Sequence, residues 1–132
     1  MRTVIALIAA AVVTGAPATA AAAPADAAQV NRSKDLWATV NVCDTADEPN
    51  VVGIRASMPG IRRRAQFFVR FQVQYLAKAD GKWHNIEANA DSGFVKLGVS
   101  RNRVIESGRN FTFLPPFDGG AHTMRGAVTF VW

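Results

Sequence analysis

The feature that most constrains this chain is an alternation of apolar and polar residues, which is most regular over residues 66–76 (QFFVRFQVQYL). Successive side chains of a β-strand point to opposite faces of the sheet. One face of this segment would carry Phe67, Val69, Phe71, Val73 and Tyr75, and the other Arg70, Gln72 and Gln74. The pattern predicts a β-strand with one buried face.

The same alternation recurs from residue 36 onward, and no stretch of that part carries a helical stripe. It predicts further strands at residues 36–43, 51–58, 83–87, 94–100, 110–114 and 123–132. In the first of these we expect Leu36, Ala38, Val40 and Val42 on one face. Asp80-Gly81 suits a tight hairpin turn, and the pairs at 115–116 (Pro-Pro) and 119–120 (Gly-Gly) break the chain. Seven short antiparallel strands favour an all-β sandwich, with a small barrel as the alternative.

The N-terminus has the organisation of a secretory signal peptide. Arg2 is followed by ten apolar residues at positions 4–13 and then by small residues and prolines up to residue 25. Because a membrane-spanning helix needs about 20 apolar residues, we expect no span in the mature chain. Cleavage can follow Ala20, Ala22 or Ala25. We predict a signal peptide at 1–25, a flexible leader at 26–35, a β-domain at 36–132, and a secreted, extracellular protein.

Composition limits the mature part to one basic domain. About 107 residues would remain after cleavage, which is enough for a single hydrophobic core. Without Arg2 these residues include 14 basic and 10 acidic side chains, a net charge of about +4. Such an excess favours weak, salt-sensitive association with anionic wall polymers or lipid head groups, although it also serves solubility.

The order of the segments resembles a known group of proteins. WATVNVCDT (37–45) opens the fold, FFVRFQVQYL (67–76) forms the long strand, and DSGFVKLG (91–98), ESGRNFTF (106–113) and RGAVTFVW (125–132) follow. This succession is similar to that of small secreted bacterial proteins with an immunoglobulin-like or fibronectin type III-like fold, mostly of unassigned function. The resemblance implies an antiparallel immunoglobulin-like β-sandwich of about seven short strands. It carries no catalytic signature, and a fold does not define an activity.

Arg62, Arg63 and Arg64 form the clearest candidate binding site. They precede the longest predicted strand, and further arginines follow at 101, 103 and 109. Arginine clusters bind phosphates and carboxylates through paired hydrogen bonds, so an anionic cell-wall or envelope polymer is a candidate ligand. Nucleic acid is not expected, because most phenylalanines alternate inward and would not be available to stack on bases. The competing interpretation is a solvated loop that prevents edge-to-edge pairing of strands.

Metal sites and cofactors have little support in the sequence. Asp44, Asp47 and Glu48 crowd carboxylates into the loop after the first strand, which suits either calcium or an ordinary acidic turn. His84 and His122 lie 38 positions apart, and neither has a second ligand at zinc spacing. We therefore expect no cofactor and leave calcium open.

Catalytic patterns are equally weak. Ser92 and Ser107 lie in Asp-Ser-Gly and Ser-Gly turns and not in a nucleophile elbow. Asp91 and Glu106 are candidates for a glycosidase pair, but any two acids in such a fold would qualify. We expect a non-catalytic module that binds an envelope component or a protein partner. A structural exported protein without a specific ligand and a hydrolase are the alternatives.

Cys43 is the chain's single cysteine, which is unusual in an exported protein. The sequence also stops at Trp132, within the apolar alternation of the last predicted strand. The resembled domains close with one further strand, so we expect that the chain is shortened and that a longer relative supplies both this strand and a second cysteine. The alternative is a complete domain with Cys43 shielded at a strand end.

Overall fold

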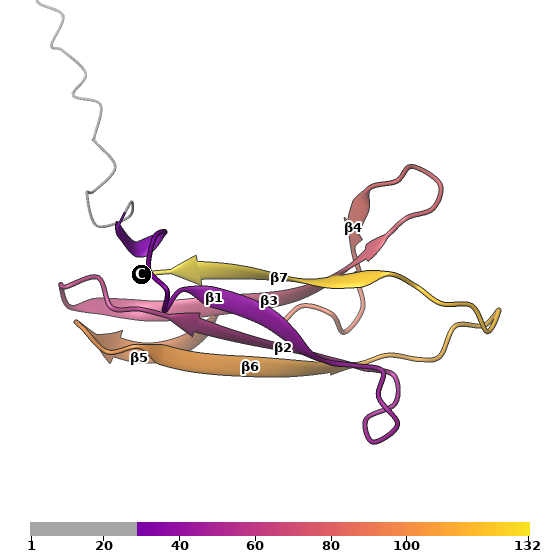
Figure 1. Ribbon diagram of the computed structural model, residues 1–132, viewed down its shortest axis with the longest axis horizontal. Helices are drawn as coiled ribbons and strands as arrows, with labels where there is room; N and C mark the ends of the chain where they lie inside the picture. The colour runs from indigo at the N-terminus through magenta and orange to yellow at the C-terminus, as the bar shows by residue number, and fades with distance from the viewer. Residues whose placement is uncertain (1–28) are drawn as a thin grey trace, which may run out of the picture.

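The computed structural model describes residues 29–132, and the predicted signal peptide at 1–25 lies outside them. The described residues form seven β-strands (Figure 1). The strands are β1 (Trp37–Cys43), β2 (Val51–Met58), β3 (Ala65–Leu76), β4 (Trp83–Asn85), β5 (Val95–Ser100), β6 (Ile105–Thr112) and β7 (Met124–Val131). Within this part of the chain, no helix is long and apolar enough to cross a membrane.

All strand pairings are antiparallel and they build two sheets. The first sheet has the order β1-β2-β6. The second is built around β3, which pairs with β7 along one side and with β5 and β4 along the other. For residues 29–132, the prediction of an all-β fold with about seven antiparallel strands is therefore confirmed.

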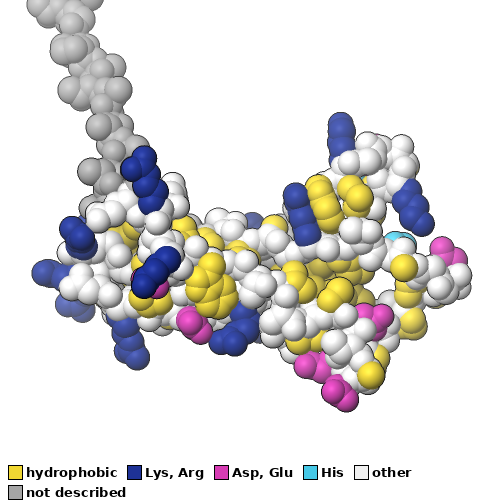
Figure 2. Space-filling model, viewed as in Figure 1, with side chains coloured by type: hydrophobic (Ala, Val, Ile, Leu, Met, Phe, Trp, Pro, Cys, Tyr) yellow, Lys and Arg dark blue, Asp and Glu magenta, His cyan; other side chains and the backbone are white. Residues whose placement is uncertain are grey.

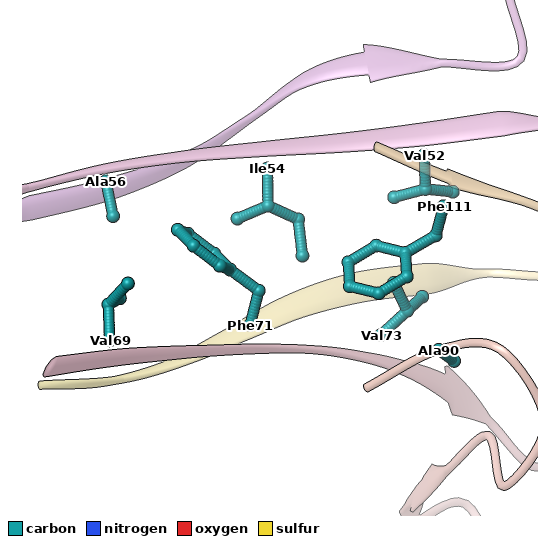
Figure 3. Packing of buried hydrophobic residues seen from close by; sticks show 8 residues of the cluster. All are labelled: Val52, Ile54, Ala56, Val69, Phe71, Val73, Ala90 and Phe111. Atoms are coloured by element: carbon teal, nitrogen blue, oxygen red, sulfur yellow. The ribbon is translucent and has the colours of Figure 1, made fainter. Parts of the chain in front are cut away.

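The hydrophobic core lies between the two sheets, as Figure 3 shows from close by. Its eight members are Val52, Ile54 and Ala56 of β2, Phe111 of β6, Val69, Phe71 and Val73 of β3, and Ala90. β3 uses the predicted face: Phe67, Val69, Phe71 and Val73 are at most 1% exposed, whereas Tyr75 is half-buried. Burying a Phe or Val side chain stabilises the fold by about 1.5–3 kcal/mol, so this one face of β3 contributes much of the driving force.

β1 departs from the predicted alternation. Val40 lies opposite Ile54, but the register then shifts, and Val42 lies opposite Gly53. Directly opposed residues share a face, so Val42 points to the face opposite to that of Val40. The prediction that Ala38, Val40 and Val42 share one face was wrong at Val42, because a β-bulge inserts one extra residue.

β6 begins five residues earlier than predicted, at Ile105 and not at residue 110. Ser107, Gly108 and Arg109 have no apolar alternation that would have marked a strand. They are extended because each pairs with a residue of β2, from Met58↔Ile105 to Val51↔Thr112. Tertiary pairing overrides weak local propensity in this strand.

The loops gather at two opposite ends of the molecule (Figure 1). One end holds the β2–β3 loop, the β5–β6 turn and the segment before β1. Trp132 closes this end, because its indole Nε1 donates a hydrogen bond to the carbonyl oxygen of Pro59 at 2.8 Å. The other end holds the β1–β2, β3–β4 and β6–β7 connections.

Candidate functional site

Basic side chains concentrate at the end that Trp132 closes, which we call the basic end. Figure 2 shows Lys and Arg side chains gathered there, on the left of the view. The basic end comprises the exposed side chains of Arg32, Lys34, Arg62, Arg63, Arg64, Arg101 and Arg103. The acidic residue among these segments is Asp35. Three separate segments therefore supply like charges to one surface, and the surface potential there is positive.

The β2–β3 loop is fixed against the β5–β6 turn by backbone contacts. The Arg62 N–H donates to the carbonyl oxygen of Arg101 at 3.1 Å, and Arg62 adopts a φ of 62°. Gly60 makes this approach possible, because a Cβ at that position would lie 2.3 Å from the same oxygen. The turn is closed by Ser100, whose Oγ accepts the N–H of Arg103 at 3.1 Å. The arginines thus project from a defined backbone frame.

A cavity of about 340 Å³ lies within the basic end. Its walls come from the segment before β1, the β2–β3 loop and the β5–β6 turn, and they include Ser33, Asp35, Arg62 and Asn102. Residues 29–30 are helical, turns follow at 31–32 and 34–35, and the Val30 side chain is buried. The cavity has both a guanidinium and a carboxylate in its wall, so the anion-binding capacity of this end lies mainly in the exposed arginines around it.

The sequence identified Arg62–Arg64 but did not connect them to Arg101 and Arg103. The β3–β5 register makes that connection, because Ala65 lies opposite Ser100 and the residues just outside this pair become neighbours. Arg109 does not join them, since it lies within β6 opposite Ile54. Recognising that residues 65–69 pair with residues 95–100 would have been enough to find the larger cluster.

Acidic residues lie at the opposite end of the molecule, in the β1–β2 loop. Their oxygens hold the loop: Asp44 Oδ1 accepts the Asn50 N–H at 2.8 Å, and Glu48 Oε2 accepts the Asn110 side-chain amide at 3.1 Å. Within residues 29–132, no group of three His, Cys, Asp or Glu side chains is placed to hold a metal ion. Asp44, Asp47 and Glu48 therefore do not form the calcium cluster that the sequence left open.

His84 has a carboxylate partner that the sequence analysis missed. Its Nε2 lies 2.7 Å from Asp80 Oδ2, four residues earlier in the β3–β4 hairpin, and its ring packs against Tyr75. The Lys82 N–H and then His84 hydrogen-bond Asp80 and lower the pKa of its carboxyl. A cleft of about 770 Å³ beside β4 is lined by His84, Glu87 and Asp91. No Ser, Cys or Thr is among its lining residues, so the side-chain nucleophiles that this cleft could offer are its carboxylates, His84 and Tyr75.

The two acids considered as a glycosidase pair are separated by the fold. Asp91 forms a bidentate ion pair with Arg70, with Arg70 Nε 2.9 Å from Oδ1, and this pair belongs to the sheet built around β3. These hydrogen bonds hold the pKa of the Asp91 carboxyl below its usual range. Glu106 instead pairs with Arg55 at 3.1 Å on the β1-β2-β6 sheet. The structure therefore does not bring the two carboxylates together.

Cys43 is exposed and free within the described residues. It lines an apolar cleft of about 700 Å³ at the end opposite to the basic end, which we call the acidic end, together with Phe113, Met124 and the β6–β7 loop. Leu114 and Phe117 of that loop are 84% and 104% exposed. Cys43 is therefore exposed at the end of β1 and not shielded.

A scan against protein-family models, a search of curated proteins and a search of solved structures found no match to this chain. Its function is therefore inferred from its own residues and their geometry.

Proposed function

We propose that this chain is an exported, non-catalytic module of immunoglobulin-like β-sandwich type that binds an anionic cell-wall or envelope polymer through its basic end. Two antiparallel sheets facing each other over one apolar core support the sandwich assignment. The N-terminal sequence pattern supports export.

The observation that carries the proposal is the gathering of basic side chains from three segments on one end. Seven basic residues lie in these segments with one acid, Asp35, whereas the acids of the β1–β2 loop lie at the opposite end. Charges scattered for solubility would not segregate in this way. A row of guanidinium groups on a fixed backbone frame matches a polymer that repeats phosphate or carboxylate groups, because each group can accept paired hydrogen bonds from one arginine.

Retention on isolated bacterial cell-wall material, with titration by long-chain polyphosphate, tests the proposal. The triple variant Arg62→Ser, Arg63→Ser, Arg64→Ser removes three positive charges from the basic end. The matched control Lys78→Ser, Lys82→Ser, Lys96→Ser removes three from exposed positions elsewhere. We expect the arginine variant to bind at least about tenfold more weakly at about 50 mM salt, and the difference to shrink near about 500 mM because screening shortens the range of the field.

The control distinguishes a defined surface from bulk charge. Equal losses in the two variants would contradict a site at the basic end and would favour a structural exported protein without a specific ligand. Retention of full binding by the arginine variant at low salt would assign the arginines to the solvated loop.

A hydrolase remains the second candidate, and the His84–Asp80 pair beside the cleft is the observation in its favour. It ranks below polymer binding because Asp91, one of the two carboxylates that line the cleft, is paired with Arg70, and no Ser, Cys or Thr lines the cleft. Release of soluble fragments from wall material by the chain, abolished by His84→Gln, would reverse this ranking.

A further inference from the structure

The outer side of β7 is one of the sheet edges that have no partner strand among the described residues. Among residues 29–132, β7 pairs with β3 along one side, and no described strand pairs with its other side, which we call the open edge. The hydrogen bond from the Leu76 N–H to the Thr123 carbonyl oxygen, at 2.9 Å, fixes which residues face β3. In an antiparallel ladder the backbone groups alternate in direction. Residues 125, 127, 129 and 131 therefore face β3, and Met124, Gly126, Val128 and Phe130 direct their N–H and C=O groups to the open edge.

Bonds on the far side of β3 support this assignment independently. The Val73 N–H donates to the Ala90 carbonyl oxygen at 2.8 Å, and the Phe71 carbonyl accepts the Ser92 N–H at 2.9 Å. The backbone N–H and C=O groups of the odd-numbered residues of β3 are thus directed away from β7. Those of its even-numbered residues are therefore directed toward β7. In the β3–β7 register each even-numbered residue of β3 lies opposite an odd-numbered residue of β7, as Gln72 does opposite Ala127. The odd-numbered residues of β7 therefore direct their backbone N–H and C=O groups to β3.

Over residues 126–131, the open edge carries none of the features that usually block strand pairing. β1 has a bulge, β5 and β6 carry charged residues, and β4 has three residues. By contrast, residues 126–131 of β7 (GAVTFV) contain no charge and no proline, and their register with β3 is continuous. Arg125 is held over the sheet, because its Nε donates to Gln74 at 2.8 Å and its guanidinium lies 4.4 Å from the Trp83 ring centroid.

Apolar surface accompanies these unpaired backbone groups. Val128 and Phe130 point into the core side yet are half-buried, whereas Val69 and Phe71 opposite them on β3 are 1% exposed. Across the layers, β1 contacts β7, and its Val40 is 39% exposed. The seam between β1 and β7 is therefore an apolar strip that an added strand would cover.

Charge decides which strand fits and in which direction. β7 runs from the end that holds Asp44, Asp47 and Glu48 to the basic end (Figures 1 and 2). Antiparallel pairing of β7 with β7 of a second copy would place each basic end beside the other copy's acidic end. Parallel pairing would instead oppose like charges, which costs free energy.

We propose that two copies of this chain associate through their open edges, with β7 pairing antiparallel to β7 about a two-fold axis. The two sheets built around β3 become one continuous sheet, and both open edges are satisfied at once. Such an isologous contact closes on itself, so it forms a dimer and not a filament. This inference is independent of polymer binding, because it uses no residue of the basic end in the strand contact.

Val128→Pro tests the pairing with little disturbance of the fold. Its N–H faces the open edge, where proline is tolerated. The matched control Ala127→Pro removes an N–H that faces β3 and should destabilise the monomer. We expect sedimentation and light scattering, from about 1 µM to about 1 mM protein, to show that the unmodified protein forms a dimer. In Val128→Pro the dissociation constant of this dimer should rise at least about tenfold, because the two-fold symmetry removes the Val128 N–H hydrogen bond from both copies.

Amide hydrogen exchange on the unmodified protein gives a second measurement that does not depend on how a variant folds. In the dimer, the Val128 and Phe130 amides should gain protection as concentration rises, while Ala127 and Thr129 are protected throughout by β3. A monomer at all concentrations, or a dimer unaffected by Val128→Pro, would overturn the proposal. A monomer whose Val128 and Phe130 amides gain protection only when an extended apolar peptide is added would overturn it in favour of a peptide partner.

Discussion

Replacing Phe71 by alanine would remove one of the large side chains that fill the space between the two sheets. Phe71 is 1% exposed, lies opposite Val128 in the β3–β7 ladder and points toward Ile54 of the other sheet (Figure 3). Loss of its burial costs about 1.5–3 kcal/mol. The cavity left behind raises the expected loss in the free energy of unfolding to about 3–5 kcal/mol, because close-packed neighbours relax only in part.

Urea unfolding followed by tryptophan fluorescence and circular dichroism measures this loss. With an m-value of about 1–2 kcal/mol/M for a domain of this size, the midpoint should fall by at least about 1.5 M. Phe117→Ala is a matched control, since Phe117 is 104% exposed and its replacement should change stability by no more than about 0.5 kcal/mol. If Phe71→Ala proves unfolded, Phe71→Leu leaves a smaller cavity and keeps the transition measurable.

A loss below about 1 kcal/mol for Phe71→Ala, or equal effects of the two alanine variants, would refute the packing argument. Either result would mean that β3 does not present the face carrying Phe71 to the core. Because a strand has a side-chain period of two, the next register would move the buried apolar face of β3 (Phe67, Val69, Phe71 and Val73) to solvent.

Three further predictions follow from local contacts. Gly60→Ala should lower stability by about 1–3 kcal/mol in thermal unfolding, because the new Cβ meets the Arg101 carbonyl oxygen; an unchanged melting temperature would contradict the packing of that loop. The pKa of Asp91 is lowered by Arg70, so the stabilisation is complete above its unfolded-state pKa of about 3.9 and is lost as pH falls through the lower native value. Asp91→Asn should therefore reduce stability near neutral pH and flatten the acid decline, and identical pH profiles would count against the ion pair. The exposed Cys43 should react with a thiol reagent as fast in the native protein as in the unfolded one, and a much slower native reaction would show that it is shielded.

Local sequence determined the strands whose side chains alternate strongly. Residues 51–58 were predicted with the bounds that β2 has, and the prediction for β3 missed only Ala65. A one-residue shift of either strand would expose its apolar face, so the burial free energy selects a single register from the sequence pattern. The Arg62–Arg64 cluster was likewise visible because its members are consecutive.

Tertiary structure decided what depends on partners distant in the sequence. The first half of β6 is extended only because it pairs with β2, and the bulge in β1 moves Val42 away from the face of Val40. The meeting of Arg62 with Arg101 follows from the β3–β5 register, and the open edge of β7 follows from which strands β3 accepts. Side-chain alternation reports which face of a strand is buried, but it holds no information about which strand lies beside it, because the backbone hydrogen bonds that join strands are the same for every residue except proline.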